Sequence, residues 1–402
     1  MKCLTLLKRK LKRNSSRKGS AHMRYQPIVT RNGCFNNPFP TWQGLPPGTA
    51  LLKVLPHFLW ESILLTVRRG GGAPGSSSKS KLLSNLPIHR PIFNKNKATA
   101  SKSPRLQYHW LGHATVLWQF VQQDINVLCD PIFSKRAGPT SWFGSKRYID
   151  SVCAVGDLPR IDAVAISHNH FDHLDLRTLK DIEQNFGNGR LDVRNNGTLE
   201  RDRRGVKYFL PMGLKQWFVS QMGLRDKDRV VELSWWESAI VSSPTTGSSI
   251  TLQFVPAQHW SGRTLFDRFV SLWGGWLLST DTEDSVQREK TRKSVTAYFV
   301  GDTGWTGEDL FGSILDVANG YIDVAAIPIG AYKPRNFMSQ QHVSPKEAYK
   351  IFEACKAQTA FAIHWGTFPL TFEKYMQPKQ RLDAFRDKRF FTMGHGESRI
   401  LE

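Results

Sequence analysis

The chain has 402 residues, of which 40% are hydrophobic and 22% are charged, with 55 Lys and Arg against 34 Asp and Glu. This length and apolar content suffice for one large domain or two ordinary ones. They exclude a wholly disordered chain, a collagen and a small disulfide scaffold. No run of about 18 uncharged apolar residues occurs, so we expect no membrane-spanning helix.

The net charge of +21 is concentrated at the front of the chain. Residues 1–123 contain 20 basic residues and a single acid, Glu61, which gives a net charge of +19. Residues 124–402 therefore carry only +2. Because the body is nearly neutral, it has no overall field that would attract nucleic acid, and we expect no nucleic-acid partner.

The five cysteines are odd in number, widely scattered and free of any CxxC motif; they are Cys3, Cys34, Cys129, Cys153 and Cys355. This usage predicts a reducing, intracellular compartment. It argues against a disulfide framework and against a zinc site built from thiolates.

Residues 1–24 contain nine Lys or Arg and no acid, with Leu4, Leu7 and Leu11 at helical spacing. Three interpretations stay open: a mitochondrial presequence, a basic arm that touches anionic lipid, and an ordinary solvated tail. We assign residues 1–35 to a basic flexible tail or targeting segment.

Residues 47–69, PGTALLKVLPHFLWESILLTVRR, form an apolar segment that ends in two arginines. It is either an interfacial helix that docks on a membrane or a helix packed on the main domain. The Gly/Ser-rich residues 70–81 predict a flexible loop. We therefore assign residues 36–105 to an N-terminal extension with an apolar helix and a Gly/Ser-rich loop.

From residue 107 onward, short apolar runs alternate with turns and helical stretches, which is typical of an α/β fold. The predicted strands are residues 115–121, 125–129, 163–166, 250–255, 297–300, 324–327 and 361–363. Many of these runs stop at a polar or charged residue, which is where an α/β sheet places its chemistry.

Residues 161–175 read IDAVAISHNHFDHLD, a buried-strand pattern followed at once by four polar candidates and then by a helical pattern. Residues two apart in an extended segment point to the same side, so His168 and His170 can bind one ion. Asp172 and His173, in the turn, can reach a second ion. Imidazole and carboxylate suit zinc. Two metals about 3.5–4 Å apart can hold a bridging hydroxide and clamp a phosphoryl or carbonyl oxygen.

The alternative for this motif is a His-rich surface turn that binds no metal. A lone histidine would be consistent with that alternative. Three His and one Asp within six residues, directly after a buried strand, favour the metal site instead.

The pattern HxHxDH after an apolar strand resembles the metallo-β-lactamase superfamily, and other residues follow in that family's order. Asp130 in LCDPIF stands at an upstream strand end. Downstream come His259 in PAQHW, Asp302 in YFVGDTGW and His364 in AIHWGTF. Each of the four follows an apolar run, and together they strengthen the resemblance.

The flanking segments narrow the resemblance to the N-acylphosphatidylethanolamine-hydrolysing phospholipase D group. They are NPFPTW at residues 37–42 and, further along, WLGHAT, VELSWWE, QHWSGRT, GDTGW, IPIGAY, QHVSP, IHWGTF and HGESR. The resemblance extends from about residue 36 to residue 402. It implies a four-layer αβ/βα sandwich of the metallo-β-lactamase type, with residues 106–402 as the hydrolase domain.

Carried over residue by residue, the resemblance implies two zinc ions held by seven side chains. One ion takes His168, His170 and His259, the other takes Asp172, His173 and His364, and Asp302 bridges both. Asp172 and Asp302 are the expected catalytic residues. Iron or manganese could replace zinc in this ligand set.

Four further residues are expected around the metals. Asp130 is expected to fix a ligand imidazole from behind. His113 and His342 either line the substrate pocket or are structural histidines. Phe171 stands where the resemblance leads us to expect Tyr, so a hydroxyl contact to a substrate phosphate is lost at that position.

The resemblance implies that a metal-bridging hydroxide attacks phosphorus and converts N-acylphosphatidylethanolamine to N-acylethanolamine and phosphatidic acid. It also implies a phospholipid substrate, a peripheral membrane location and a homodimer. Two enzyme alternatives stay open, a nucleic-acid phosphodiesterase and a lactonase of the same fold. A non-catalytic interaction protein is the remaining alternative, but the seven intact candidate ligands oppose it.

Overall fold

The computed structural model describes residues 25–44, 86–94, 104–187, 191–193, 199–201, 205–264, 266–280 and 294–402. The predicted tail at residues 1–24, the apolar segment 47–69 and the loop 70–81 lie outside these ranges. None of the helices within the described ranges has the length and apolar character needed to cross a bilayer.

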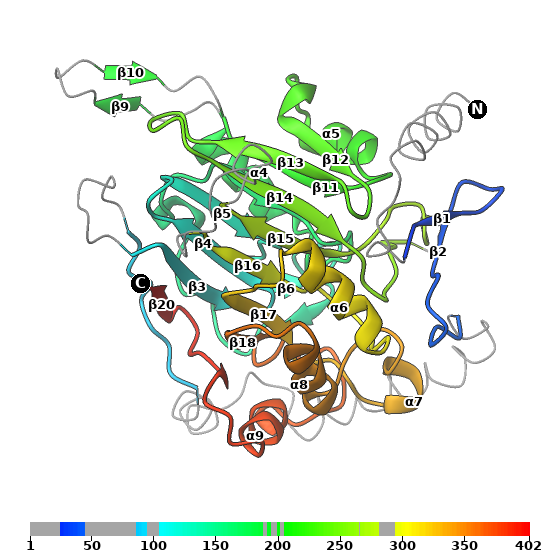
Figure 1. Cartoon of the computed structure of the whole chain (residues 1–402). Helices are drawn as coiled ribbons and strands as arrows, with labels where there is room; N and C mark the ends of the chain where they lie inside the picture. Colours follow the sequence, from blue (N-terminus) through cyan, green and yellow to red (C-terminus); the bar gives the residue numbers. More distant parts are fainter. Residues whose placement is uncertain are drawn as a thin grey trace.

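Two seven-stranded sheets lie face to face (Figure 1). The first has the strand order β12 (Val230–Leu233), β11 (Lys207–Pro211), β8 (Ala163–Ala165), β5 (Ile125–Cys129), β4 (Thr115–Phe120), β3 (Leu106–Gly112) and β20 (Ser398–Leu401). The second runs β13 (Ser238–Ser242), β14 (Ser249–Val255), β15 (Gly275–Ser279), β16 (Thr296–Phe299), β17 (Val324–Pro328), β18 (Thr359–Ile363) and β19 (Phe390–Phe391). Each sheet is antiparallel on one side and parallel on the other.

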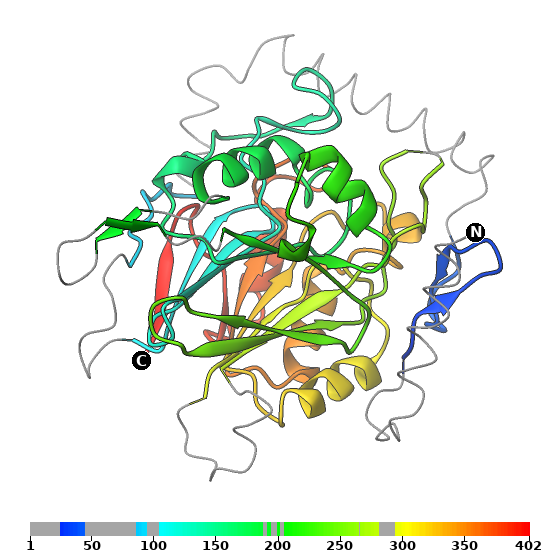
Figure 2. The ribbon, with the colours of Figure 1, turned by 90° about the horizontal axis from the view of Figure 1, so that it is seen from above.

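Helices cover the outer face of each sheet, so the molecule has four layers (Figure 2). On the first sheet lie α4 (Leu176–Phe186) and α5 (Lys215–Met222), which contribute to one apolar core with that sheet. On the second lie α6 (Glu308–Val317) and α8 (Pro345–Ala354), and α8 packs on β17 and on α9 (Gln377–Asp383). The sandwich expected from the sequence is confirmed.

The remaining short elements connect or flank these layers. They are the strand pairs β1 (Ile28–Val29) with β2 (Phe35–Asn36), β6 (Arg136–Ala137) with β7 (Ser145–Lys146), and β9 (Leu191–Val193) with β10 (Leu199–Arg201), the helix α7 (Arg335–Met338), and the 3-10 turns η1 (Val155–Asp157) and η2 (Lys227–Arg229). The β1–β2 pair crosses residue 35, where we placed a domain boundary, and the boundaries stay a prediction.

The central strands of the first sheet are apolar on both faces because each face contacts a different core. In β4, Val116, Trp118 and Phe120 face the core between the sheets, whereas Leu117 faces the helices α4 and α5. Alternate residues of a strand point to opposite faces, so a fully buried strand reads as a continuous apolar run. All seven predicted strands are found within about a residue or two of their expected ends.

A buried histidine interrupts this apolar sheet. His109, on β3, donates from Nε2 to the side-chain oxygen of Gln119 at 2.9 Å, and the Gln119 amide donates to Asn126 at 3.0 Å. Burial lowers the pKa of His109 to about 4, although the Gln119 hydrogen bond opposes the shift. The folded protein therefore holds this imidazole neutral at pH values where an unfolded chain protonates it.

The stability of the protein should fall as the pH is lowered from 6.5 to about 4, partly because of His109. In this window the unfolded chain binds a proton at His109 and the folded chain does not, which costs at most about 1.4 kcal/mol per pH unit. His109→Gln keeps a donor near Nε2 and removes that proton. Urea unfolding at a series of pH values should show a shallower slope for the variant, and equal slopes would contradict the assignment.

Candidate metal centre

The candidate residues gather where strands of both sheets end at one edge of the sandwich. Asp130 follows β5, the His168–His173 turn follows β8, and His259, Asp302 and His364 follow β14, β16 and β18. These strands run in the same direction within each sheet, so their carboxyl ends meet at that edge.

A tight turn between β8 and α4 presents four of these side chains. The backbone N–H groups of His173 and Leu174 both donate to the carbonyl of His170, at 3.1 and 2.8 Å. Asp175 then caps α4 by accepting from the Thr178 hydroxyl at 2.6 Å and from the Arg177 N–H at 3.3 Å. The turn is therefore fixed at its middle and at its end.

His168, His170 and His259 form the first cluster. His170 Nδ1 lies 2.9 Å from His168 Nε2 and 3.2 Å from His259 Nε2. Burial lowers the pKa of all three imidazoles, to about 3 for His170 and about 4 for His259. Three neutral rings thus bring their nitrogens together, and lone pairs converging in this way suit a metal ion.

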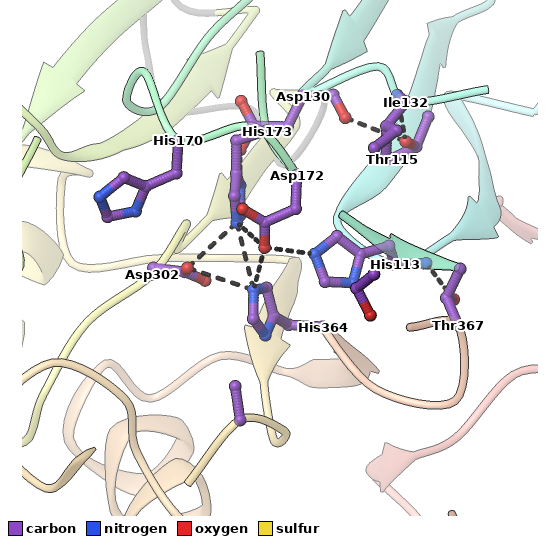
Figure 3. A network of polar contacts seen from close by, with 12 residues as sticks. His113, Thr115, Asp130, Ile132, His170, Asp172, His173, Asp302, His364 and Thr367 are labelled. Carbon is purple, nitrogen blue, oxygen red and sulfur yellow. Dashed lines mark hydrogen bonds and ion pairs between the residues drawn. The ribbon is translucent and has the colours of Figure 1, made fainter. Parts of the chain in front are cut away.

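Asp172, His173, His364 and His113 form the second cluster (Figure 3). The Asp172 carboxylate lies 2.9 Å from His113 Nε2, 3.5 Å from His173 Nε2 and 3.4 Å from His364 Nε2. The two ligand candidates His173 and His364 face each other at 3.1 Å. The sequence analysis left His113 as either a pocket residue or a structural histidine, and the structure places it in this cluster.

Asp302 lies between the two clusters. Its Oδ2 atom is 3.0 Å from His173 Nε2 and 3.2 Å from His364 Nε2. The same atom is 3.8 Å from a nitrogen of each of three further rings, His168, His259 and His342. Asp302 is 3% exposed. One carboxylate oxygen therefore faces both clusters, an arrangement that would allow Asp302 to contact two ions.

The charges of the second cluster fit a bound cation. Burial opposes protonation of His173 and His364, yet the neighbouring carboxylates, Asp302 foremost, raise both pKa values, that of His364 to about 9. Burial would also raise the pKa of Asp302, but His173 and His364 hold it well below its usual range. The site thus draws positive charge to the place between Asp172 and Asp302, which is the property that a divalent metal site needs.

Hydrogen bonds behind the rings direct ligand nitrogens toward the centre. His259 donates from Nδ1 to the Gln341 carbonyl at 2.9 Å, which leaves its Nε2 lone pair free. His173 donates from Nδ1 to Asp130 at 2.6 Å, and Asp130 also accepts from the Ser167 N–H at 2.7 Å. Asp130 therefore contacts the side of the His173 ring that faces away from the cluster, and its role behind a metal ligand stays a prediction.

Backbone conformation is unusual at three of these positions. His113, Asp130 and His364 are left-handed, with φ of 53°, 41° and 61°. Hydrogen bonds hold two of them in place, because the His364 N–H donates to the His113 carbonyl at 2.8 Å and the His113 N–H donates to Thr367 at 2.6 Å. Such conformations persist where surrounding contacts enforce them, often at functional sites.

His342 and Phe171 lie at the rim of the centre. The His342 ring centroid is 5.1 Å from that of His259 and 5.2 Å from that of His364, so it borders both clusters. The ring of Phe171 has a charged neighbour. The guanidinium of Arg263 lies 4.0 Å from its ring centroid, which makes a cation–π contact.

Arg263 is a residue that the sequence analysis did not single out. Its Nη1 donates to the carbonyls of Asn169 and Leu174, at 2.9 and 2.8 Å, and so holds both ends of the ligand turn. Its guanidinium lies 5.1 Å from the Trp217 ring as well. The signal in the sequence is the segment QHWSGRT, which contains Arg263 and belongs to the family resemblance.

The known proteins that this chain resembles agree with one another in family. A family model described as a beta-lactamase superfamily domain matches residues 125–365. An N-acyl-phosphatidylethanolamine-hydrolyzing phospholipase D 1 of Caenorhabditis elegans is 34% identical over 91% of this chain and 92% of its own. A mitochondrial N-acyl-phosphatidylethanolamine-hydrolyzing phospholipase D of Saccharomyces cerevisiae is 27% identical over 92% of this chain and 74% of its own.

Among solved structures, an isothiocyanate hydrolase from Delia radicum gut bacteria superposes with a TM-score of 0.50 at 15% identity. It covers 74% of this chain and 99% of its own. At that identity the likeness concerns the fold alone.

Arg263→Met should loosen the ligand turn. The substitution keeps most of the apolar stem but leaves the carbonyls of Asn169 and Leu174 without their donor, at about 1–3 kcal/mol for each unpaired group. Urea unfolding should show the loss. Arg268→Met is the matched control, because the interaction of the Arg268 guanidinium with described residues is its contact with the Trp260 ring at 5.8 Å. Its loss should cost about 1 kcal/mol or less. Equal losses in the two variants would contradict a specific role for Arg263.

Proposed function

The chain belongs to the beta-lactamase superfamily and, within it, to the family of N-acyl-phosphatidylethanolamine-hydrolysing phospholipases D, and from this premise we propose that it is a dizinc phosphodiesterase acting on N-acylphosphatidylethanolamine. Its products would be N-acylethanolamine and phosphatidic acid. The broader statement, a metal-dependent hydrolase, follows from the family and from the His and Asp clusters. The observation that carries the proposal is the position of Asp302 Oδ2. In a chain that belongs to this phospholipase D family, this atom faces both clusters.

The proposed ligand sets follow the two clusters. His168, His170 and His259 would hold one zinc ion, Asp172, His173 and His364 would hold the other, and Asp302 would contact both. When bound, such ions lower the pKa of water to about 7 and offset negative charge on a phosphoryl group. His and Asp side chains suit zinc, and the absence of thiolates from these sets leaves room for water and substrate.

The protein's own residues prepare these sets. The Gln341 carbonyl and Asp130 accept hydrogen bonds from the Nδ1–H groups of His259 and His173, so that each ring presents Nε2 to the centre. Burial keeps the first cluster neutral and its lone pairs available. Asp172 and Asp302, the proposed catalytic carboxylates, stay ionised beside the histidines.

The proposed reaction adds water to the phosphodiester on its phosphorus atom. A new P–O bond forms to the water oxygen, and the P–O bond to the N-acylethanolamine oxygen breaks. One water proton goes to the departing oxygen, which leaves as an alcohol. Phe171 offers no hydroxyl to the phosphate, and its ring contacts Arg263 instead.

A peripheral membrane location is part of the proposal, since the substrate is a membrane lipid. The basic front of the chain and the apolar residues 47–69 support it. The acid-free residues 1–24 and the mitochondrial name of the yeast relative support import into mitochondria. The homodimer stays a prediction.

Product analysis tests the activity. Zinc-loaded protein incubated with N-acylphosphatidylethanolamine vesicles should release N-acylethanolamine and phosphatidic acid, detected by mass spectrometry. Chelator treatment should abolish the release and zinc should restore it. His170→Ala should lower the rate by more than about 100-fold, because even residues behind the metal ligands contribute about 10–100-fold.

The same assay run in water enriched in oxygen-18 tests which bond breaks. Attack on phosphorus places the label in phosphatidic acid, whereas attack on carbon places it in N-acylethanolamine. Absence of both products from metal-loaded protein would overturn the lipid assignment, and RNA and lactone substrates would then be assayed.

Membrane docking is tested by replacing Trp60 and Leu64 with Ser. Burial of an apolar side chain contributes about 1.5–3 kcal/mol, so loss of this surface should lower the affinity for phospholipid vesicles, measured by sedimentation, by about tenfold or more. Hydrolysis of a soluble phosphodiester should be unchanged. Equal losses of both properties would indicate that the segment packs on the main domain instead.

A further inference from the structure

Residues 25–44 form a segment, here called the N-terminal strap, that includes the NPFPTW motif at residues 37–42. The proposed function gives this motif no role. The strap lies along one side of the molecule (β1 and β2 in Figures 1 and 2). Phe35 and Phe39 are each 3% exposed, and the Phe35 N–H donates to the Phe269 carbonyl at 2.7 Å. These contacts anchor the strap to the body.

From this anchored position the strap contacts the backbone of a candidate ligand. The Asn37 side-chain amide donates to the His259 carbonyl at 2.7 Å. Asn37 is 8% exposed and His259 is fully buried, so water competes poorly for this bond. The two residues are 222 positions apart in the chain.

The strap also holds the loop that orients the His259 ring. Thr41 donates to the side-chain oxygen of Gln258, whose amide donates to the Gln340 carbonyl at 2.9 Å. The Gln340 side chain in turn accepts from the Gln43 N–H and donates to the Gly44 carbonyl, both at 2.9 Å. The next residue, Gln341, supplies the carbonyl that accepts from His259 Nδ1.

We propose that Asn37 is a positioning residue for His259, and that the N-terminal strap thereby supports metal binding at the first cluster but not at the second. The strap bonds directly to the backbone of His259, and it holds Gln340, the residue before the carbonyl that accepts from His259 Nδ1. The second cluster depends on other contacts, since Asp130 holds His173 and the His113 loop holds His364. This inference rests on the proposed pair of zinc sites.

The experiment measures zinc per chain after dialysis against increasing chelator concentrations. It uses Asn37→Leu, which preserves size and removes the amide donor. The wild type should retain two zinc ions, and the variant should lose one of them at a chelator activity about 10–100-fold lower. Thr30→Val is the matched control, because Thr30 accepts from the Cys34 N–H in the strap's own turn. It should retain both ions like the wild type.

Two background variants identify the ion that is lost. His364→Ala should leave the first cluster as the remaining site, and Asn37→Leu in that background should release its zinc. His170→Ala should leave the second cluster, and Asn37→Leu should there change zinc retention less than twofold. Thr41→Val, which breaks the contact to Gln258, is the second probe if Asn37→Leu fails to fold, as judged by its melting curve.

The possible outcomes distinguish a failure of the proposed function from a failure of the proposed role of the strap. Wild-type protein that binds no zinc would overturn the proposed function itself. Wild-type protein with two zinc ions, together with unchanged retention in the strap variants on the His364→Ala background, would overturn only the role of the strap. Loss of zinc from both backgrounds would also overturn it, since a general weakening of the fold affects both clusters.

Discussion

The buried carboxylate of Asp302 is the constraint around which the centre is arranged. A carboxylate that is 3% exposed is costly to ionise, by several kcal/mol, unless positive charge or strong donors surround it. The rings of His173 and His364 lie within 3.2 Å of its Oδ2 and hold its pKa well below the usual range. The first cluster cannot help in this way, because burial keeps its three histidines neutral. The site therefore combines lone pairs on one side with two carboxylates that attract positive charge on the other, and a divalent cation satisfies both.

The sandwich determines where such an arrangement can exist. Strands surrounded by apolar side chains offer no room for charge, so the charged candidate residues lie just beyond the strand ends. Left-handed backbone at Asp130 and His364 turns the chain at those ends. The strain is balanced by the hydrogen bonds that join neighbouring loops, such as His364 to His113. Rigid sheets thus hold ligands from distant parts of the chain at a common edge.

The sequence allowed the strands and the α/β class to be predicted because doubly buried strands read as uninterrupted apolar runs. It also pointed to the HNHFDH turn, since these candidate ligands are neighbours in the chain. The family resemblance added His259, Asp302 and His364 in order. What could not be predicted depends on distance in the sequence. Nothing local shows that Arg263 reaches the carbonyls of Asn169 and Leu174, or that Asn37 meets His259 across 222 positions.

The same distances make metal binding a property of the whole fold. The first cluster joins the β8 turn of one sheet to His259 at the end of β14 in the other, and the second joins the same turn to His364 after β18. A cation that binds only when these ends have met stabilises the folded chain by RT ln(1 + [L]/Kd) and opposes separation of the sheets. The Asn37 contact adds the front of the chain to this unit. Loops that carry ligands are ordinarily the least stable parts of a protein, and here the strap, the Arg263 contacts and the cation would each raise the free energy needed to open them.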